Sequence, residues 1–287
     1  MHRKSGRRAS ALLTTALFSL AIWTVMLMGL AGSSRAQVTI VQLSDTHIGL
    51  STAPHSSANL TKAVQMINQL HPDAVIVTGD IGERLTAWQQ ARKILSALTV
   101  PVFYAPGNHD VHTHNVADYR KVFGPDYYRF TIKGVVFLVI DSQLLGNYDN
   151  FSATTPPPLP ADTAAESAKM ITWLANQAAS IPKGATVIGV QHIPIFRNGS
   201  FPGSKPYWII SDPYRTREMT QLTKIGVKHM LVGHWHNYRV FLSNGITWHE
   251  GASTSWLPFG GQLGFSVHVI SNGNVQSRFV AIPGATP

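Results

Sequence analysis

The chain has 287 residues, of which 44% are hydrophobic, so it can bury a substantial core and is not a disordered protein. It contains no cysteine, which excludes disulfides and thiolate metal sites and leaves His, Asp, Asn and Glu to bind any metal. The formal charge is +9, but five basic residues lie in the first 36 positions, and the other 18 face 14 acids without forming a Lys/Arg run, which argues against dedicated nucleic-acid binding.

The first 36 residues have the pattern of an export signal. Basic residues between Arg3 and Arg8 precede an apolar stretch from Ala9 to about Leu30, and Ser34-Arg35-Ala36 offers small residues for cleavage before Gln37. The apolar segment at 9–32 is nearly long enough to span a bilayer, so an uncleaved membrane anchor is the alternative. We expect a signal peptide or signal anchor at 1–36 and one soluble domain at 37–287, which is periplasmic, secreted or anchored outside the cytoplasm.

Apolar strands and amphipathic helices alternate in the first third of this domain. The predicted strands are 38–43, 74–78 and 102–105, and the predicted helices are 58–70 and 85–98. The strands are almost continuously apolar, as strands buried on both faces are. This alternation predicts an α/β layered fold.

The remaining two thirds mix helices with hairpins and two long loops. The pattern predicts a hairpin at 127–132 and 135–140, helices at 163–179 and 214–225, strands at 186–191 and 229–232, and four final antiparallel strands at 238–243, 246–250, 265–270 and 275–280. Irregular stretches at 146–162 and 197–213 are long enough to suggest a functional role. Tyr207 and Trp208 in the second stretch are candidates for a substrate wall or for anchoring the loop to the core.

Metal-binding residue types follow five of the predicted strands. They occur in Asp45-Thr46-His47, Gly79-Asp80, Gly107-Asn108-His109-Asp110, His192 and Gly233-His234-Trp235-His236. Ligands of an α/β sheet bind in the crevice outside the carboxyl ends of its strands, so neighbouring strand ends would gather these side chains. Neutral imidazole and carboxylate are ligands for zinc, iron or manganese.

Asp80 is the natural bridge between two such ions, because one carboxylate offers an oxygen to each. Two ions about 3.5–4 Å apart clamp the attacking and leaving oxygens of a phosphoryl displacement, and they lower the pKa of a bound water. They also reduce the charge repulsion that protects a phosphate ester from attack. The residue types therefore predict metal-assisted hydrolysis of a small phosphorylated substrate.

The five motifs, in this order, resemble the calcineurin-like metallophosphoesterase superfamily over the whole of residues 37–287. The resemblance implies a four-layer α/β-β-α sandwich with a dinuclear metal site at one rim. The spacing between the first two motifs is similar to that of the cyclic-nucleotide phosphodiesterase branch as well as to that of broad-specificity phosphatases. Monoesters and diesters both remain candidate substrates, since the loops rather than the metal ligands select the ester.

The resemblance also implies roles for individual residues. Asp45, His47 and His236 correspond to ligands of the first metal, Asp80 to the bridge, and Asn108, His192 and His234 to ligands of the second. His109 corresponds to a histidine that contacts substrate phosphate and acts as general acid. Some members carry an acid three residues after the bridging Asp, followed by Arg; here these positions hold Glu83, which would orient His109, and Arg84, which would bind phosphate. The tyrosine that purple acid phosphatases place after the bridging Asp is absent, so the metals are left open among Mn, Fe and Zn.

The mechanism we expect is direct attack on phosphorus by a metal-bound hydroxide, with His109 protonating the leaving oxygen. One alternative is a catalytically silent protein that binds phosphorylated ligands on the same fold; the presence of every expected ligand argues against it. A nuclease is a second alternative, which the mild charge disfavours.

Overall fold

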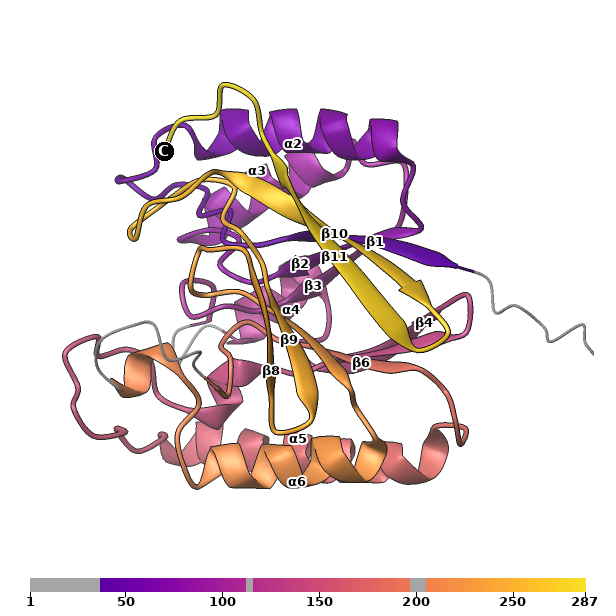
Figure 1. Cartoon of the computed structure of the whole chain (residues 1–287). Coiled ribbons are helices and arrows are strands. Elements are labelled where there is room, and N and C mark those ends of the chain that lie inside the picture. The colour runs from indigo at the N-terminus through magenta and orange to yellow at the C-terminus, as the bar shows by residue number, and fades with distance from the viewer. Residues whose placement is uncertain (1–36, 112–115, 197–204) are drawn as a thin grey trace, which may run out of the picture. The chain divides into compact units, whose positions relative to one another are not determined.

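The computed structural model describes residues 37–111, 116–196 and 205–287 (Figure 1). The expected signal or anchor at 1–36, two histidines after the third motif (His112 and His114) and the first part of the 197–213 loop lie outside the described residues. Within the described ranges, none of the helices has both the length and the hydropathy needed to span a bilayer.

The strands form two mixed sheets whose central strands are parallel. The first sheet has the order β11-β10-β1-β2-β3, with β1 at Val38–Leu43, β2 at Ala74–Thr78, β3 at Val102–Ala105, β10 at Gly264–Ser271 and β11 at Asn274–Ala281. The second has the order β4-β5-β6-β7-β9-β8, with β4 at Tyr128–Ile132, β5 at Val135–Val139, β6 at Val187–Val190, β7 at His229–Val232, β8 at Arg239–Ser243 and β9 at Ile246–Glu250.

Helices cover the outer face of each sheet, and the two inner faces pack together. In Figure 1, α2 (Ser56–Leu70) and α3 (Leu85–Leu95) lie above the first sheet, and α5 (Ala161–Ser180) and α6 (Tyr214–Ile225) lie below the second. This is the four-layer α/β-β-α sandwich that the sequence motifs implied.

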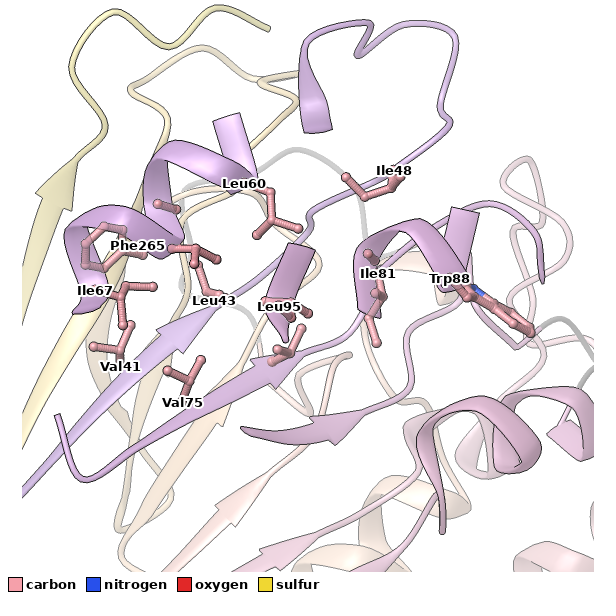
Figure 2. Close-up of a cluster of buried hydrophobic side chains, with 14 of the residues drawn as sticks. Val41, Leu43, Ile48, Leu60, Ile67, Val75, Ile81, Trp88, Leu95 and Phe265 are labelled. Carbon is pink, nitrogen blue, oxygen red and sulfur yellow. The ribbon is translucent and has the colours of Figure 1, made fainter. Parts of the chain in front are cut away.

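The alternation of side chains along each strand builds the layers. Val41 and Leu43 of β1 point to α2 and α3, in the cluster drawn in Figure 2, whereas Ile40 packs between the sheets against the second sheet's Phe137 and Ile188. Period-two alternation sends successive residues to opposite faces, and both faces are covered here. The central strands β1 and β2 are therefore almost continuously apolar, as the sequence predicted.

Three features differ from the sequence prediction. The last four strands pair antiparallel as β8–β9 and β10–β11, as predicted, but β9 also runs parallel to β7, pairing His229 with Thr247 and Val232 with Glu250. This parallel pair was not predicted; it forms because β8 takes the sheet edge, which leaves β9 between β8 and β7. Helix α3 ends at Leu95 rather than 98, and α4 (Val116–Phe123) was not predicted, since eight residues are too few to show a helical period.

A buried network of histidines joins the two sheets. His229 Nδ1 lies 3.1 Å from His249 Nε2, and His249 Nδ1 lies 2.8 Å from Ser277 Oγ. The same hydroxyl lies 2.7 Å from His268 Nδ1, and His268 Nε2 donates to Gln42 Oε1 at 2.9 Å. Strands β7 and β9 of one sheet are thereby connected to β11, β10 and β1 of the other, so the network fixes how the sheets lie on each other.

Gln42 extends the network to the carboxyl ends of the central strands. Its amide donates to the Thr78 hydroxyl at 3.0 Å and to the Val232 carbonyl at 2.8 Å. Thr78 is the last residue of β2 and Val232 the last of β7, so one side chain ties together two strand ends that belong to different sheets. Both strands lead directly into sequence motifs.

Acid should destabilise the fold through this network. Burial lowers the pKa of His268 to about 3 and that of His249 to about 2, whereas an unfolded histidine titrates near 6.5. Below pH 6.5 these histidines become protonated in the unfolded chain but stay neutral in the folded chain. The free energy of unfolding therefore decreases as the pH falls. We predict that His268→Gln reduces the dependence of unfolding free energy on pH between 6.5 and 4 by about 1.4 kcal/mol per pH unit.

Urea unfolding at several pH values measures this effect. His55→Gln, at an exposed position, is the control and should leave the pH dependence as it is in the parent. Equal pH dependence in the His268 variant and the parent would mean that His268 is not kept neutral by burial.

Candidate metal centre

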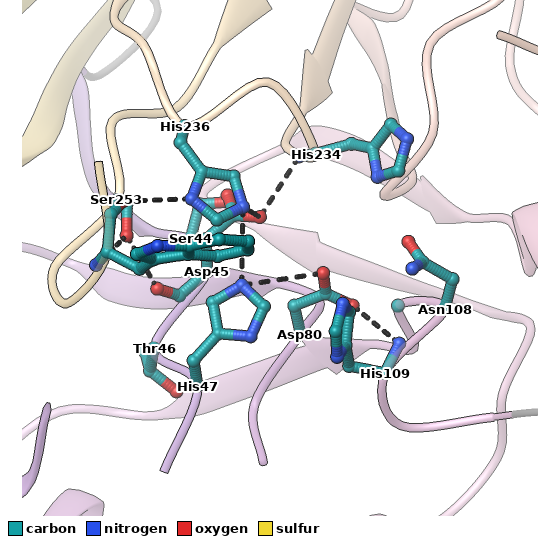
Figure 3. Close-up of polar contacts among 12 residues, drawn as sticks. Ser44, Asp45, Thr46, His47, Asp80, Asn108, His109, His234, His236 and Ser253 are labelled. Carbon is teal, nitrogen blue, oxygen red and sulfur yellow. Dashed lines mark hydrogen bonds and ion pairs between the residues drawn. The ribbon is translucent and has the colours of Figure 1, made fainter. Parts of the chain in front are cut away.

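The five motifs meet at one rim of the sandwich, where the parallel strands of both sheets end. Asp45 and Asp80 follow β1 and β2 of the first sheet, and His192 and His234 follow β6 and β7 of the second. The four side chains are almost completely buried. Figure 3 shows His47 and His236 on one side of Asp80, with Asn108 and His234 on the other.

An unusual backbone conformation turns these side chains inward. Among the described residues, nine that are not glycine have positive φ, and five of them belong to the predicted ligand set. These five, with φ between 41° and 74°, are Asp45, His47, Asp80, His234 and His236. A non-glycine residue held in the left-handed region costs on the order of 1–3 kcal/mol, so the surrounding fold stabilises a strained local geometry at this rim.

The first group of ligand atoms converges from three motifs. His47 Nε2 lies 3.2 Å from His236 Nε2 and 3.6 Å from Asp80 Oδ2, and His236 Nε2 lies 3.2 Å from Asp45 Oδ1. One atom from each of the four residues falls within 4.8 Å of the others. Nitrogen and oxygen atoms that face one another in this way match the arrangement of ligands around a common cation.

The second group shares Asp80 with the first. Asp80 Oδ2 lies 3.2 Å from His192 Nε2, and the rings of His192 and His234 are 5.1 Å apart. Asp80, His192 and His234 again offer atoms within 4.8 Å of one another. Asp80 is thus the carboxylate common to both groups, which is the position that a bridging ligand requires.

Each of the four buried histidines hydrogen-bonds outward through its other ring nitrogen. The acceptors are the Glu83 carboxylate for His47 (3.2 Å), the Thr78 carbonyl for His192 (2.7 Å), the Tyr207 carbonyl for His234 (2.9 Å) and the Trp256 carbonyl for His236 (2.8 Å). A neutral imidazole that donates from one nitrogen carries a lone pair on the other. The outward bonds therefore turn the other ring nitrogen of each histidine into the cluster, where a neutral ring offers the lone pair that metal-ligating histidines require.

Burial sets the charge of this cluster. It lowers the pKa of His47, His234 and His236, the last to about 4, so these imidazoles are neutral and their contacts with carboxylates are not salt bridges. Burial also raises the pKa of Asp45, to about 6. His192 differs, because the nearby Asp80 carboxylate outweighs burial and raises its pKa to about 9.

Two buried polar atoms in the cluster have no hydrogen-bond partner. They are Asn108 Oδ1 and His192 Nε2, the second of which lies close to Asp80 without hydrogen-bond geometry. A buried polar atom without a partner is costly, and both belong to residues predicted to bind the second cation. The nitrogen and oxygen donors present fit a pair of Zn, Fe or Mn ions. Asp45, His47, Asp80 and His236 would hold one, and Asp80, Asn108, His192 and His234 the other.

Glu83 joins the site to His109. Its Oε2 accepts from His109 Nδ1 at 3.0 Å while its Oε1 accepts from His47, so one carboxylate orients two histidines. Although burial opposes it, the Asp80 charge and the Glu83 hydrogen bond raise the pKa of His109 to about 9. The His109 side chain is 22% exposed, so a substrate can reach it.

The structure does not bring the side chains of Arg84 and Asp110 into the cluster of ligand atoms. Arg84 is exposed at the start of α3, and in the described part of the chain it makes no hydrogen bond or ion pair with the cluster. Asp110 is fully buried and accepts from the backbone N–H groups of Ile81, Gly82 and Gly107. It fastens the loop after Asp80 to the loop after β3 and contacts the cluster only through the backbone.

Sequence reasoning missed the segment after β9. Trp256 accepts the His236 hydrogen bond through its carbonyl, and its ring lies 5.1 Å from that of His236 and 5.6 Å from that of His47. Ser253 and Ser255 donate to the Asp45 carbonyl at 2.8 Å and 2.9 Å. The available signal was the run of small residues from 251 to 255 directly after the predicted strand at 246–250.

Glycine at position 107 is required by close packing. A Cβ added there would lie 2.2 Å from both the backbone nitrogen and the Oδ1 of Asp80. The neighbouring His109 N–H donates to the same Oδ1 at 2.9 Å. The loop after β3 therefore presses its backbone against the shared carboxylate and fixes its orientation.

Comparisons with known proteins agree with this geometry. The model of the family described as calcineurin-like phosphoesterase matches residues 38–238. Serine/threonine-protein phosphatase CPPED1 of Mus musculus is 28% identical over 192 residues, which are 61% of this chain and 57% of that protein. Its counterpart in Danio rerio is 27% identical over 243 residues, 77% of this chain and 73% of that protein. The chain thus spans little more than half of the mouse relative.

Solved structures show the same fold at lower identity. GAP50, the anchor in the inner membrane complex of Plasmodium, superposes with a TM-score of 0.61 at 21% identity and covers 87% of this chain and 86% of its own. A dimetal phosphatase from Danio rerio superposes with a TM-score of 0.57 at 14% identity, covering 85% and 99%.

The contact between Glu83 and His109 can be tested without any metal. In the metal-free protein, Glu83→Gln should lower the pKa of His109 from about 9 by about one pH unit or more, because a neutral amide replaces the carboxylate that favours the imidazolium. NMR titration of the His109 ring, assigned by its loss in His109→Gln, measures the change.

Arg84→Gln alters the next residue, which is exposed, and serves as the control. Because this substitution removes a positive charge, it should not lower the pKa of His109. A His109 pKa that stays near 9 in the Glu83 variant would show that Glu83 does not orient this histidine.

Proposed function

The chain belongs to the calcineurin-like phosphoesterase family, and on that premise we propose that it hydrolyses phosphate esters at a dinuclear metal site on this rim. The observation that carries the proposal is the sharing of Asp80 between two groups of buried ligand atoms whose histidine ring nitrogens all face inward. A pair of cations bound there would neutralise phosphate charge and lower the pKa of a water for attack on phosphorus.

The residues of the chain would hold the reacting phosphate and supply a proton. The buried ligands and their outward hydrogen bonds provide a rigid, water-poor floor, so the reacting phosphate is held without rearrangement of the protein. His109 stands beside this floor with Nδ1 tied to Glu83, which leaves Nε2 to face a substrate. The Glu83 hydrogen bond favours the protonated form of His109, which would donate its proton to the leaving oxygen.

Phosphate monoesters are the substrates we favour. The mouse and zebrafish relatives are named serine/threonine-protein phosphatases, which cleave monoesters. The metal ligands do not distinguish monoesters from diesters, so both nitrophenyl phosphate and bis-nitrophenyl phosphate belong in the first assays.

Export is a second part of the proposal and rests on the sequence of residues 1–36. The basic start, the apolar stretch and the small residues before Gln37 together resemble a secretory signal. We propose that the domain at 37–287 works outside the cytoplasm, released by cleavage or held by the apolar segment at 9–32.

Substitutions at the shared ligand and at the proton donor should have different effects. Asp80→Asn and His236→Ala should lose bound metal and turnover together, because each removes a ligand from the cluster. His109→Ala should keep its metal but lose about 100-fold or more in kcat on alkyl phosphates, which need a protonated leaving group, and far less on nitrophenyl phosphate. Elemental analysis and kinetics on the same preparations, loaded with Mn, Zn or Fe, measure both quantities.

Three outcomes would contradict the proposal in distinct ways. Metal-loaded parent protein that binds phosphate esters without turnover would indicate a silent binding protein. Strongly salt-dependent DNA binding with cleavage would indicate a nuclease. Parental rates on alkyl phosphates in the His109 variant would remove the proton-donor role alone.

The N-terminus of the exported protein tests the second part of the proposal. Expressed in full from its own start, the protein should be recovered outside the cytoplasm with Gln37 as its first residue. Intact mass and N-terminal sequencing measure this. An uncleaved chain in the membrane fraction would indicate an anchor, and an uncleaved chain in the cytoplasm would contradict export.

A further inference from the structure

A row of five aromatic side chains runs outward from the second ligand group. We call it the aromatic wall, and it consists of Phe151, Tyr207, Trp208, Trp235 and Phe259. Each of its rings lies within 6.1 Å of another, from the Phe151–Tyr207 contact at 5.1 Å to the Trp235–Phe259 contact. The wall is built from four separate segments of the chain, which carry Phe151, Tyr207 with Trp208, Trp235 and Phe259, so only the tertiary structure assembles it.

The inner end of the wall touches the candidate metal centre. The Tyr207 hydroxyl accepts from Asn108 Nδ2 at 3.0 Å, and the Tyr207 carbonyl accepts from His234. The rings of Tyr207 and Trp208 lie 5.1 Å and 5.2 Å from that of His234. A phosphate bound at the ligand cluster would therefore sit at the foot of the wall.

The middle of the wall is rigid. Trp208 and Trp235 are stacked, with centroids 4.7 Å apart and ring planes at 28°, and Trp235 is buried. Two stacked indoles, one of which is buried in the protein, are held in place by their packing. The wall therefore has one defined shape to present to a ligand.

The outer end of the wall is exposed. Among the large hydrophobic side chains that are exposed in the described ranges, the two aromatic ones are Phe151, at 52%, and Phe259, at 42%. A single exposed phenylalanine means little, but both of these sit on one wall that leads to the candidate centre. Their rings contact Trp208 at 5.7 Å and 5.3 Å.

We propose that the aromatic wall binds the planar base of a nucleoside monophosphate whose phosphate lies at the metal centre. This inference rests on the proposed phosphoesterase function and names its substrate class. Aromatic faces stack on any base. The exposed Phe259 contacts Trp208, whose ring contacts His234, so its ring is separated from the cluster by one intervening side chain, as a base is separated from its phosphate by the sugar.

A cation lies at the outer end of the wall. The Lys205 ammonium lies over the Phe151 ring, 4.9 Å from its centroid. It occupies one face of Phe151, so Phe259 at the same end is the ring on which a base would stack.

The experiment compares adenosine 5′-monophosphate with ribose 5-phosphate, which share the same scissile bond and differ in the base. In the metal-loaded parent protein, kcat/KM for the nucleotide should exceed that for the sugar phosphate by about 10-fold or more. Phe151→Ala and Phe259→Ala should each reduce this ratio several-fold. Phe259→Leu, which keeps an apolar side chain but no ring, should reduce it as well. Leu242→Ala, at a 73% exposed position on β8, is the control and should keep the parental ratio.

Tryptophan fluorescence of the metal-free protein gives a readout that is independent of turnover. Adenosine 5′-monophosphate should quench Trp208 and Trp235 in the parent at concentrations where ribose 5-phosphate does not, and Phe259→Ala should weaken the response. A ratio near one in the parent, or a ratio restored by Phe259→Leu, would overturn the assignment to a base. If the nitrophenyl esters are also not hydrolysed, the phosphoesterase proposal fails, and the fluorescence comparison alone decides whether the wall binds the base.

Discussion

The candidate centre depends on one constraint: four buried imidazoles each give their outer N–H to a fixed acceptor, so their other ring nitrogens face a common interior. Three of these acceptors are backbone carbonyls, and the fourth is the Glu83 carboxylate. Two aspartates are buried among these rings, and burial raises the pKa of Asp45 to about 6. Carboxylates enclosed with neutral imidazoles are stabilised by positive charge, which two cations would supply.

Much of the surrounding structure serves to hold this arrangement. The left-handed backbone of Asp80 aims its carboxylate at both ligand groups, and Gly107 allows the neighbouring loop to approach that carboxylate. Asp110 fastens the two loops to each other. The Thr78 carbonyl that holds His192 belongs to a residue whose hydroxyl accepts from Gln42, so the histidine network between the sheets reaches the centre through a single side chain. Contacts from both sheets thus offset the energetic cost of the strained backbone at the rim.

The two sides of the centre differ in the residues that surround them: one side is compact and the other opens outward. Around His47 and His236, the Trp256 ring and Glu83 complete a compact surround, and Glu83 leads on to the exposed face of His109. Around His234, the surroundings open outward along the aromatic wall to an exposed phenylalanine on each of two loops. Under the proposed function, proton transfer would belong to the first side and recognition of the substrate base to the second.

The sequence by itself determined the layers and the ligand candidates, because both depend on local order. Alternating apolar strands and helices predict a layered sheet, and a motif directly after a buried strand must lie at its carboxyl end. A layered α/β fold could therefore be predicted, and the resemblance of the five motifs to the family implied its α/β-β-α form. The same resemblance, through the acid three residues after the bridging Asp, implied that Glu83 orients His109.

Only the tertiary structure decided the contacts that cross the chain. The inner nitrogens of His47 and His236 face each other across 189 positions of sequence, and the acceptors from Tyr207 and Trp256 come from loops without a ligand motif. The parallel placement of β9 brings the Trp256 segment to the rim, and the aromatic wall draws on four separate segments. Such contacts carry no period or spacing in the sequence, because they arise where separately ordered segments pack against one another.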